Sequence, residues 1–302
     1  MTKVFIDGSA GTTGLRIYDR LQEREDLELI ILPDECRKDI NERKKALNSA
    51  DIAFLCLPDA AAIEAVSLIE NDKTVVIDTS TAHRTAQGWT YGFPELVGYD
   101  TVANAKRIAN PGCHASGFVA LVAPLVRAGI IADDSMLSCF SLTGYSGGGK
   151  KMIAEYESAE RSKLLDAPRQ YGLTQQHKHL PEMSAITGLK NAPAFCPIVA
   201  DYYSGMEVTV PLFNANAEEI MQVYAKAYEN GLVHFVKDPE EGGFLSANAF
   251  SGRDDMQITV SGNAERLLLT ARFDNLGKGA SGAAIQNMNL VLGVDEKTGL
   301  NV

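Results

Sequence analysis

Residues 3–21 read KVFIDGSAGTTGLRIYDRL, and this stretch decides the fold class that the sequence predicts. A short apolar run at 3–6 is followed by a glycine-rich turn. Apolar residues then recur at helical spacing over 13–21. The stretch therefore predicts a strand, a glycine turn and a helix in direct succession.

The same alternation continues through the first third of the chain. Continuous apolar runs predict buried strands at 27–32, 51–58 and 74–80, and the segments 39–48 and 60–70 between them have helical character. Strands joined by helices form parallel sheets that are covered on both faces. The first third is therefore predicted to be α/β.

The pattern changes after Pro111. An apolar helix is expected at 117–128, and beyond it apolar and polar residues alternate at 136–144, 206–213 and 266–274. Such alternation is typical of an antiparallel or mixed sheet with one face packed by helices. We therefore predict a second part of α+β type.

A last helical pattern lies at 279–294. The β/α units of the first third leave one face of the first sheet short of helices, and we expect this last helix to cover that face. We predict a first domain at 1–112, completed by 279–302, and a second domain at 113–278. The length agrees, because 302 residues suit two domains of roughly 100 to 200 residues.

Composition limits the kinds of partner. Hydrophobic residues make up 45% and charged residues 22% of the chain, which is typical of a globular protein. No apolar run approaches the roughly 18 to 20 residues of a membrane-spanning helix, and no signal segment precedes the first strand, so we expect a cytoplasmic protein without a membrane partner. A net charge of −11 argues against nucleic acid as a partner. Five cysteines without paired spacing indicate neither a disulfide framework nor a zinc site.

Gly8, Gly11 and Gly14 form a GxxGxxG pattern between the first strand and the first helix. Glycine lets the backbone approach a pyrophosphate, whose charge then meets the amides of the helix N-terminus. Thr12 and Thr13 add hydroxyl groups. The spacing alone is as typical of an ordinary turn, but its place in the first β/α unit favours a Rossmann-type dinucleotide-binding domain.

The segment LPDECRKD at 32–39 follows the second strand, where the choice between NAD and NADP is made. Asp34 and Glu35 can accept hydrogen bonds from a ribose 2′-hydroxyl, whereas Arg37 and Lys38 can pair with a 2′-phosphate. A solvated charged loop is the third interpretation. These residues alone leave the choice open.

Cys113 follows Asn110-Pro111-Gly112 at the expected start of the apolar helix. The amides and dipole of a helix start favour the reactive thiolate. A structural cysteine is the alternative interpretation. The remaining cysteines fit core or loop positions and are Cys36, Cys56, Cys139 and Cys196.

His177 and His179, followed by Glu182, supply a candidate base. An imidazole can take and return a proton near neutral pH, and a carboxylate can fix its tautomer. If this segment is extended, both histidines face one side and fit two metal ligands. We expect no metal, because no further ligands follow at a recognisable spacing, and an exposed loop remains the other alternative.

A serine nucleophile is the rival to the cysteine. Residues 144–148 read GYSGG, which matches the GxSxG pattern around Ser146. The next residues, Gly149-Lys150-Lys151, make the loop glycine-rich and basic, which suits an anion better. A serine hydrolase would also leave the nucleotide-binding pattern without a use.

Together these segments resemble the shorter N-acetyl-gamma-glutamyl-phosphate reductases, a family within the wider aspartate-semialdehyde-dehydrogenase-like group. The resemblance runs through nearly the whole chain. Its motifs are FIDGSAGTTG at 5–14, DTSTAHR at 78–84, YGFPEL at 91–96, NPGCHASG at 110–117, TGYSGGGK at 143–150, HKHLPEM at 177–183 and KGASGAAIQNMNLVLG at 278–293. The longer enzymes carry tyrosine after the nucleophile and Asp-Phe before the arginine of the DxS segment, where this chain has His114 and Ala82-His83, so the contacts of His114 and His83 are in doubt.

The resemblance implies NADPH-dependent reduction of N-acetyl-gamma-glutamyl phosphate to the semialdehyde, in arginine biosynthesis, through a thioester on Cys113. It implies His179 as the acid and base, with His177 the less favoured candidate. The cofactor residues that it implies are Gly8, Gly11, Thr12, Thr13, Gly14, Arg37 and Ser80. The substrate residues that it implies are Arg84, Ser146, Lys150 and Glu182.

We expect a small-molecule substrate and a homo-oligomer, either a dimer or a tetramer. Three alternatives remain at this stage. They are a related acyl-phosphate or semialdehyde dehydrogenase, a serine hydrolase using Ser146, and a non-catalytic nucleotide-sensing protein that would need no reactive thiol.

Overall fold

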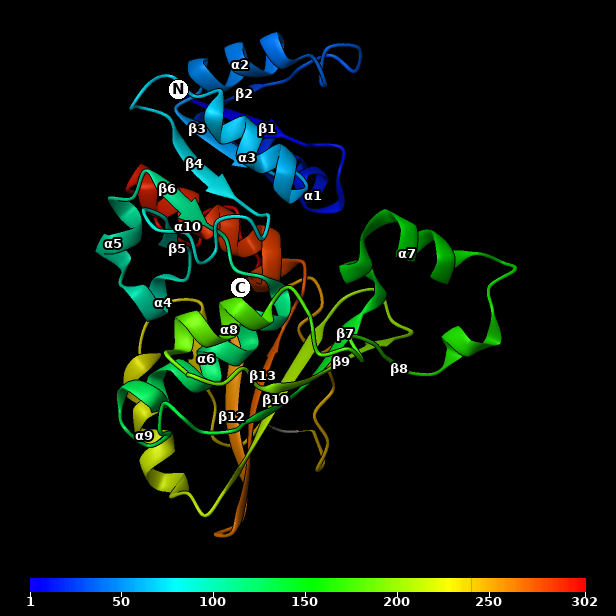
Figure 1. Ribbon diagram of the computed structural model, residues 1–302, viewed down its shortest axis with the longest axis vertical. Helices are drawn as coiled ribbons and strands as arrows, with labels where there is room; N and C mark the ends of the chain where they lie inside the picture. The colour runs from blue at the N-terminus through cyan, green and yellow to red at the C-terminus, as the bar shows by residue number, and fades with distance from the viewer. Residues whose placement is uncertain (240) are drawn as a thin grey trace. The chain divides into compact units, whose positions relative to one another are not determined.

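The computed structural model describes residues 1–239 and 241–302. The chain forms two compact units, each traced in Figure 1. The first comprises Met1–Pro111 and Ala280–Leu300, and the second comprises Gly112–Gly279 and Asn301–Val302. One unit contains a parallel sheet and the other a mixed sheet, which confirms the predicted fold class.

The first unit contains a six-stranded sheet in the order β2-β1-β3-β4-β6-β5, and all of its strand pairings are parallel. Continuous burial of β3 and β4 shows that both faces of the sheet are covered. The strands are β1 (Thr2–Asp7), β2 (Leu27–Ile30), β3 (Ile52–Leu55), β4 (Val75–Asp78), β5 (Thr90–Tyr91) and β6 (Arg107–Ala109).

Helices pack on both faces of this sheet. Val4 and Ile6 of β1 join a core that includes residues of α1 and α10, and Phe5 joins the core with α2 and α3. The C-terminal helix therefore covers the same face as the first helix. The helices are α1 (Thr12–Leu21), α2 (Ile40–Ser49), α3 (Asp59–Ser67), α4 (Pro94–Val97), α5 (Tyr99–Ala103) and α10 (Gly282–Leu292).

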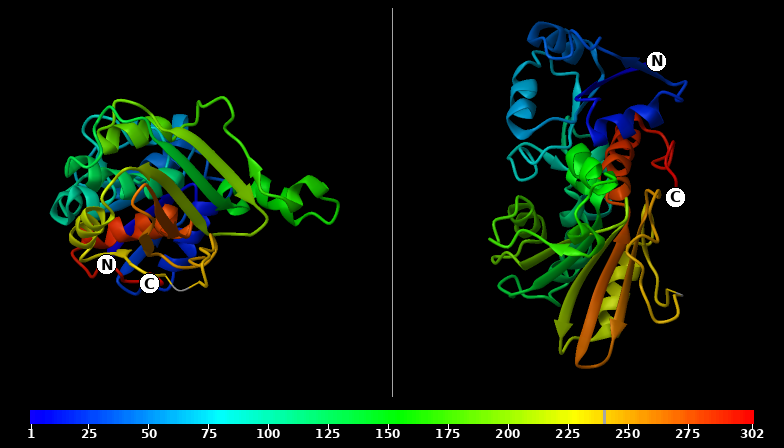
Figure 2. Two further views of the ribbon diagram at one scale, coloured as in Figure 1. Left: turned by 90° about the horizontal axis from the view of Figure 1, so that it is seen from below. Right: turned by 90° about the vertical axis from the view of Figure 1, so that its right-hand side faces the viewer.

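The second unit contains a seven-stranded mixed sheet in the order β11-β12-β13-β10-β7-β9-β8. Its long central strands are visible in Figure 2. In β10 buried residues alternate with half-buried ones, so one face is packed and the other is partly exposed. The strands are β7 (Ser138–Gly144), β8 (Arg169–Gln170), β9 (Ala194–Ala200), β10 (Met206–Phe213), β11 (Val233–Phe235), β12 (Met256–Gly262) and β13 (Arg266–Phe273).

Helix α6 is the core helix of the second unit. It lies on β10 and β13, where Gly117 allows close approach because a Cβ there would lie 2.5 Å from Val208 Cγ2. Pro124 lacks an N–H, and the carbonyl of Ala120 one turn earlier accepts a hydrogen bond from the hydroxyl of Tyr228 at 2.5 Å. The helices of this unit are α6 (Cys113–Arg127), α7 (Gly149–Glu157), α8 (Leu180–Thr187) and α9 (Ala217–Ala227).

Several element boundaries differ from the expected ones. Helix α6 begins at Cys113 rather than at 117. The residues of its first turn are small or polar, so they show no apolar periodicity in the sequence, although they are helical and mostly buried. The final helix begins only at Gly282, after a π-helical turn at Gly277–Ser281. Within the residues that the structure describes, no helix is long and apolar enough to cross a membrane.

Candidate active site

Cys113 is the first residue of α6 and is partly exposed, as expected for a thiol at a helix start. The backbone N–H of Gly112, which precedes it, donates to Oε1 of Glu182 at 2.8 Å, and Glu182 is buried. Gly279 also lies close to Cys113, since a Cβ there would be 3.1 Å from Cys113 Cβ. The start of α6 therefore contacts Glu182 of α8 through Gly112, and Gly279 through Cys113.

Three histidines, one of which follows Cys113 directly in the sequence, gather in one cluster. The ring of His114 lies 5.7 Å from the ring of His177 and 5.6 Å from that of His179, and the last two rings are 4.8 Å apart. The segment His177 to His179 is a turn into α8 rather than an extended strand, so the alternating geometry considered for two metal ligands is absent. Among the described residues, no cluster of three or more His, Cys, Asp or Glu side chains could hold a metal ion.

The protonation of this cluster is set by burial. Desolvation lowers the pKa of His114 to about 3, with smaller contributions from His177 and Lys178, so this imidazole is neutral at neutral pH. Burial also lowers the pKa of His177, with Lys178 as the second cause. His179 is buried at the N-cap position of α8, whereas His177 is half-buried.

Two residues of this site were not predicted from the sequence. The hydroxyl of Tyr171 lies 2.6 Å from Nε2 of His114, and Oγ of Ser141 lies 2.7 Å from its Nδ1. Burial raises the pKa of Tyr171, and the charge of Cys113 is the second cause. Neither residue belongs to a recognisable motif, and the sequence alternation of β7 did not reveal that Ser141 is buried, because its apolar neighbour Phe140 is the exposed residue.

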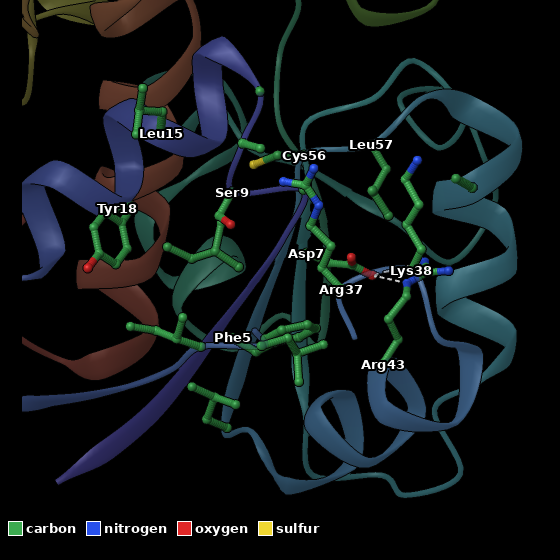
Figure 3. Close-up of a pocket in the computed structure, with 18 of the residues that line it drawn as sticks. Phe5, Asp7, Ser9, Leu15, Tyr18, Arg37, Lys38, Arg43, Cys56 and Leu57 are labelled. Atoms are coloured by element: carbon green, nitrogen blue, oxygen red, sulfur yellow. Dashed lines mark hydrogen bonds and ion pairs between the residues drawn. The ribbon is translucent and has the colours of Figure 1, made fainter. Parts of the chain in front are cut away.

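In the first unit, the glycine turn borders a cavity of about 650 Å³ (Figure 3). Gly8 has a φ of +90°, and a Cβ there would lie 2.3 Å from the carbonyl oxygen of Cys56. A Cβ on Gly14 would lie 2.4 Å from the oxygen of Gly8, whereas Gly11 has ordinary space. Glycine is therefore required by the protein itself at Gly8 and Gly14, and Gly11 is exposed at the N-cap of α1.

The charged side chains of the cavity wall are three basic and two acidic ones. Arg37 and Lys38 line it, together with Asp34, which pairs with Arg37 at 3.3 Å. Arg43 of α2 also lines it, and its guanidinium pairs with Asp7 at 2.9 Å (Figure 3). The same guanidinium pairs with Glu64 at 2.8 Å. Burial raises the pKa of Asp7 even though Arg43 opposes the shift. Thr12 and Thr13 follow the cavity-lining Gly11 and stand in the first turn of α1.

Ser80 and Arg84 lie in the loop after β4. Ser80 donates through its backbone N–H and its hydroxyl to the buried carboxylate of Asp78, at 2.9 and 2.7 Å. His83 Nδ1 is 2.6 Å from the same carboxylate, and the His83 ring stacks on Trp89. Arg84 is buried and donates to the carbonyl oxygens of Asn110 and Thr79. This loop thus restrains the segment that leads to Cys113.

Ser146 is buried, and its hydroxyl accepts a hydrogen bond from Nδ2 of Asn275 at 3.0 Å. A serine at a nucleophile elbow must present its hydroxyl at the surface. The GxSxG match is therefore a structural turn, formed by the short helix Tyr145–Gly148. Lys150 is exposed at the start of α7.

Two family models match the chain. The model described as "Semialdehyde dehydrogenase, NAD binding domain" covers residues 3–105, and "Semialdehyde dehydrogenase, dimerisation domain" covers residues 113–275. The solved structures of aspartate semialdehyde dehydrogenases from Vibrio cholerae (form II) and Francisella tularensis share the fold. Each has a TM-score of 0.70, with 18% and 16% sequence identity, and 97% of this chain is covered, against 98% and 100% of those chains.

Curated relatives match over almost the full length. N-acetyl-gamma-glutamyl-phosphate reductase 2 of Nostoc sp. is 46% identical over 99% of this chain and 99% of its own. The reductase of Burkholderia lata is 45% identical over 96% of each chain, and reductase 2 of Pseudomonas putida is 44% identical over 96% of each.

Proposed function

The chain belongs to the N-acetyl-gamma-glutamyl-phosphate reductases of the semialdehyde dehydrogenase family, and from this premise we propose that it reduces N-acetyl-gamma-glutamyl phosphate with NADPH, in arginine biosynthesis. It is an oxidoreductase with a Rossmann-type NAD-binding domain. The observation that carries the proposal is Cys113 in the first turn of α6, followed by His114, whose ring clusters with those of His177 and His179. We propose that the first unit binds the dinucleotide and that the second carries the chemistry.

In the proposed reaction the thiolate of Cys113 attacks the acyl-phosphate carbonyl. A carbon–sulfur bond forms, the carbon–oxygen bond to phosphate breaks, and phosphate leaves with its electron pair. NADPH, when bound, supplies the hydride that reduces the thioester. The resulting oxyanion is stabilised by the backbone amides at the start of α6, and its collapse breaks the carbon–sulfur bond to release the semialdehyde.

We propose His179 as the group that takes the thiol proton, gives it to the oxyanion to form the thiohemiacetal, and takes it back as the thiohemiacetal collapses and the electron pair of the carbon–sulfur bond returns to Cys113. His179 is buried at the start of α8, the helix whose Glu182 holds the backbone of Gly112 beside Cys113. His177 remains the second candidate, because its ring lies 4.8 Å from that of His179. His114 is a poor acid, since its pKa of about 3 leaves it neutral at the pH of the reaction.

The dinucleotide fits the glycine turn. The cradle at Gly8 and Gly14 has no room for a Cβ, and the cavity beside it exposes the N-terminus of α1 to a pyrophosphate. We propose contacts from Gly11, Thr12 and Thr13 there, from Ser80 after β4, and from Arg37 to a 2′-phosphate. Arg37 and Lys38 in the cavity wall support NADP over NAD.

We propose Lys150 as the exposed positive group for the substrate's phosphate or carboxylate. The side chains of the other three substrate candidates reach protein partners: Ser146 reaches Asn275, Glu182 reaches Gly112, and Arg84 reaches Asn110 and Thr79. We propose that these three shape the substrate site. We also propose that the chain forms a homo-oligomer, which the partly exposed face of the second sheet supports with Phe140 and Leu268 at 41% and 44% exposure.

The test is phosphate-dependent reduction of NADP⁺, measured with N-acetylglutamate semialdehyde and with aspartate semialdehyde. We expect a preference for the former, and no reaction when phosphate is omitted. Replacing NADP⁺ by NAD⁺ should slow the reaction. A preference for aspartate semialdehyde would overturn the proposed substrate, and a preference for NAD⁺ would overturn the proposed cofactor.

A further inference from the structure

The π-helical turn Gly277–Ser281 lies against Cys113, and the reaction described above gives it no role. Single π-helical turns are rare and frequently occur at functional sites. A Cβ at Gly279 would lie 3.1 Å from the Cβ of Cys113. It would also lie 3.1 Å from the carbonyl oxygen of Asp274 and 3.2 Å from Cε2 of Phe273. Gly279 therefore fits between the nucleophile candidate, the backbone that follows β13 and a core ring, with less than the ordinary room for a methyl group.

The carbonyl group of Asp274 anchors this turn. It accepts hydrogen bonds from the N–H of Gly277 and from the N–H of Gly279, both at 3.0 Å. The second of these bonds spans five residues, which is the hydrogen bond of a π-helix. The place at which Gly279 meets Cys113 is therefore set by Asp274.

The side chain of Asp274 is fully buried and is itself held by hydrogen bonds. Its Oδ1 accepts from the N–H of Leu276 at 2.8 Å. Its Oδ2 accepts from the N–H of Gly252 at 2.6 Å and from the hydroxyl of Ser204 at 3.2 Å. A buried carboxylate is costly unless such donors compensate for its lost hydration, so these contacts fix where the Asp274 backbone lies.

The first residue of the turn is also fixed by packing. A Cβ at Gly277 would overlap the carbonyl oxygen of Arg253. The next residue, Asp254, donates its N–H to the carbonyl of Asn301 at 2.7 Å, and its carboxylate accepts the N–H of Asn301 at 2.9 Å. The turn is therefore enclosed at Gly277 by this segment and at Gly279 by Cys113.

We infer that Asp274 is a positioning residue for Cys113, which acts through the π-helical turn and Gly279. Because Gly279 packs against the Cβ of Cys113, the turn limits the positions that the Cys113 sulfur can take. A displacement of about 1 Å at a reacting atom can cost about 100-fold in rate. The inference rests on the proposed function in taking Cys113 as the nucleophile.

The first test compares Asp274→Asn with the wild type in phosphate-dependent reduction of NADP⁺ with N-acetylglutamate semialdehyde. Both carboxylate oxygens accept a backbone N–H, so in either orientation the NH₂ group of asparagine faces one of these donors. The turn then shifts and carries Gly279 with it. We expect kcat to fall about tenfold and KM for the semialdehyde to stay within about twofold, because the sulfur moves and the groups that bind the substrate do not.

The matched control is Asp255→Asn. Asp255 is also buried, and its carboxylate pairs with the side chain of Arg253 at 2.6 Å rather than with the turn. Thermal unfolding should show a lower unfolding temperature for both variants, whereas kcat should fall only in Asp274→Asn. An equal fall of kcat in Asp255→Asn would overturn the positioning role.

A second variant acts at the contact itself. Gly279→Ala keeps the carboxylate of Asp274 and adds a methyl group 3.1 Å from the Cβ of Cys113. It should slow the alkylation of Cys113 by iodoacetamide about tenfold, measured by mass spectrometry of the Cys113 peptide with Cys36 as the internal reference. Asp274→Asn should slow the same alkylation, and Gly279→Ala keeps the test conclusive if Asp274→Asn does not fold.

Wild-type kcat in folded Asp274→Asn, or wild-type alkylation of Cys113 in folded Gly279→Ala, would overturn the inference. Alkylation requires no substrate. Slowed alkylation of Cys113 in both variants would therefore support the inference even where failure of the reductase assay overturned the proposed function.

Discussion

The glycine turn of the first unit and the cysteine pocket of the second are built by different means. At Gly8 and Gly14 the backbone conformation and the closeness of other backbone atoms decide the geometry, and the Leu57 side chain adds a contact at 3.1 Å from a Cβ at Gly8. Around Cys113 the geometry depends on side chains from β7, the segment after β8, and α8. The first site should therefore be sensitive to an added methyl group and the second to lost polar atoms.

The largest effect is expected on the side-chain-built site. Cys113→Ser should reduce NADP-linked turnover to background, because a serine hydroxyl is a poor nucleophile without a dedicated activating system. The serine-hydrolase alternative makes the opposite prediction, with Ser146→Ala as the lethal change. Steady-state rates of both variants, at equal folded concentration, distinguish the two mechanisms. Near-normal activity of Cys113→Ser would contradict the thioester mechanism.

His179→Asn should lower kcat by roughly 100- to 10,000-fold, the usual contribution of general acid–base catalysis. Cys113 should still be acylated by the activated acyl phosphate. The matched control is His177→Asn, the neighbouring ring at 4.8 Å. If His177→Asn lowers kcat strongly and His179→Asn leaves it unchanged, the roles proposed for the two histidines are reversed.

The backbone-built site is tested by Gly8→Ala. Alanine at a φ of +90° is strained by about 1–3 kcal/mol, and the contact with the carbonyl of Cys56 adds to this cost. We expect a lower unfolding temperature and loss of NADP⁺ affinity, measured by thermal unfolding and by titration. Gly11→Ala, where a Cβ has ordinary contact, should keep the unfolding temperature; an equal loss there would contradict the steric argument.

The smallest effect is expected on the pH dependence of the free energy of unfolding. The folded-state pKa of His114, about 3, lies below its ordinary value of 6.5, so the folded state binds fewer protons between these values. Stability should therefore fall as the pH falls from about 6.5, by about 2–3 kcal/mol at pH 4.5. Urea unfolding at pH 7 and pH 4.5 should show a smaller decrease in His114→Gln than in the wild type.

Substitution of the half-buried His234 by glutamine serves as the control for that measurement. It should leave the decrease between pH 7 and pH 4.5 unchanged. If His114→Gln and the wild type lose the same stability, burial does not hold the imidazole neutral.

The candidate site was predicted in part. The helix start at Cys113 and the pair His177 and His179 follow from local sequence, because a turn residue before an apolar helix and a short His-x-His motif are local signals. Tyr171 and Ser141 could not be found in this way. They lie 57 and 27 residues from His114 and meet it only when β7, the segment after β8 and α6 pack together.

The sequence by itself determined the parallel α/β pattern of the first unit, the mixed sheet that follows and the glycine turn, because burial period and glycine sterics act over a few residues. The tertiary structure decided which polar groups meet. It buried Ser146 against Asn275, turned Glu182 to the backbone of Gly112, and linked Ser141 to Tyr171 through a neutral His114. Hydrogen-bond partners and desolvation depend on packing between distant segments, and no local pattern encodes them.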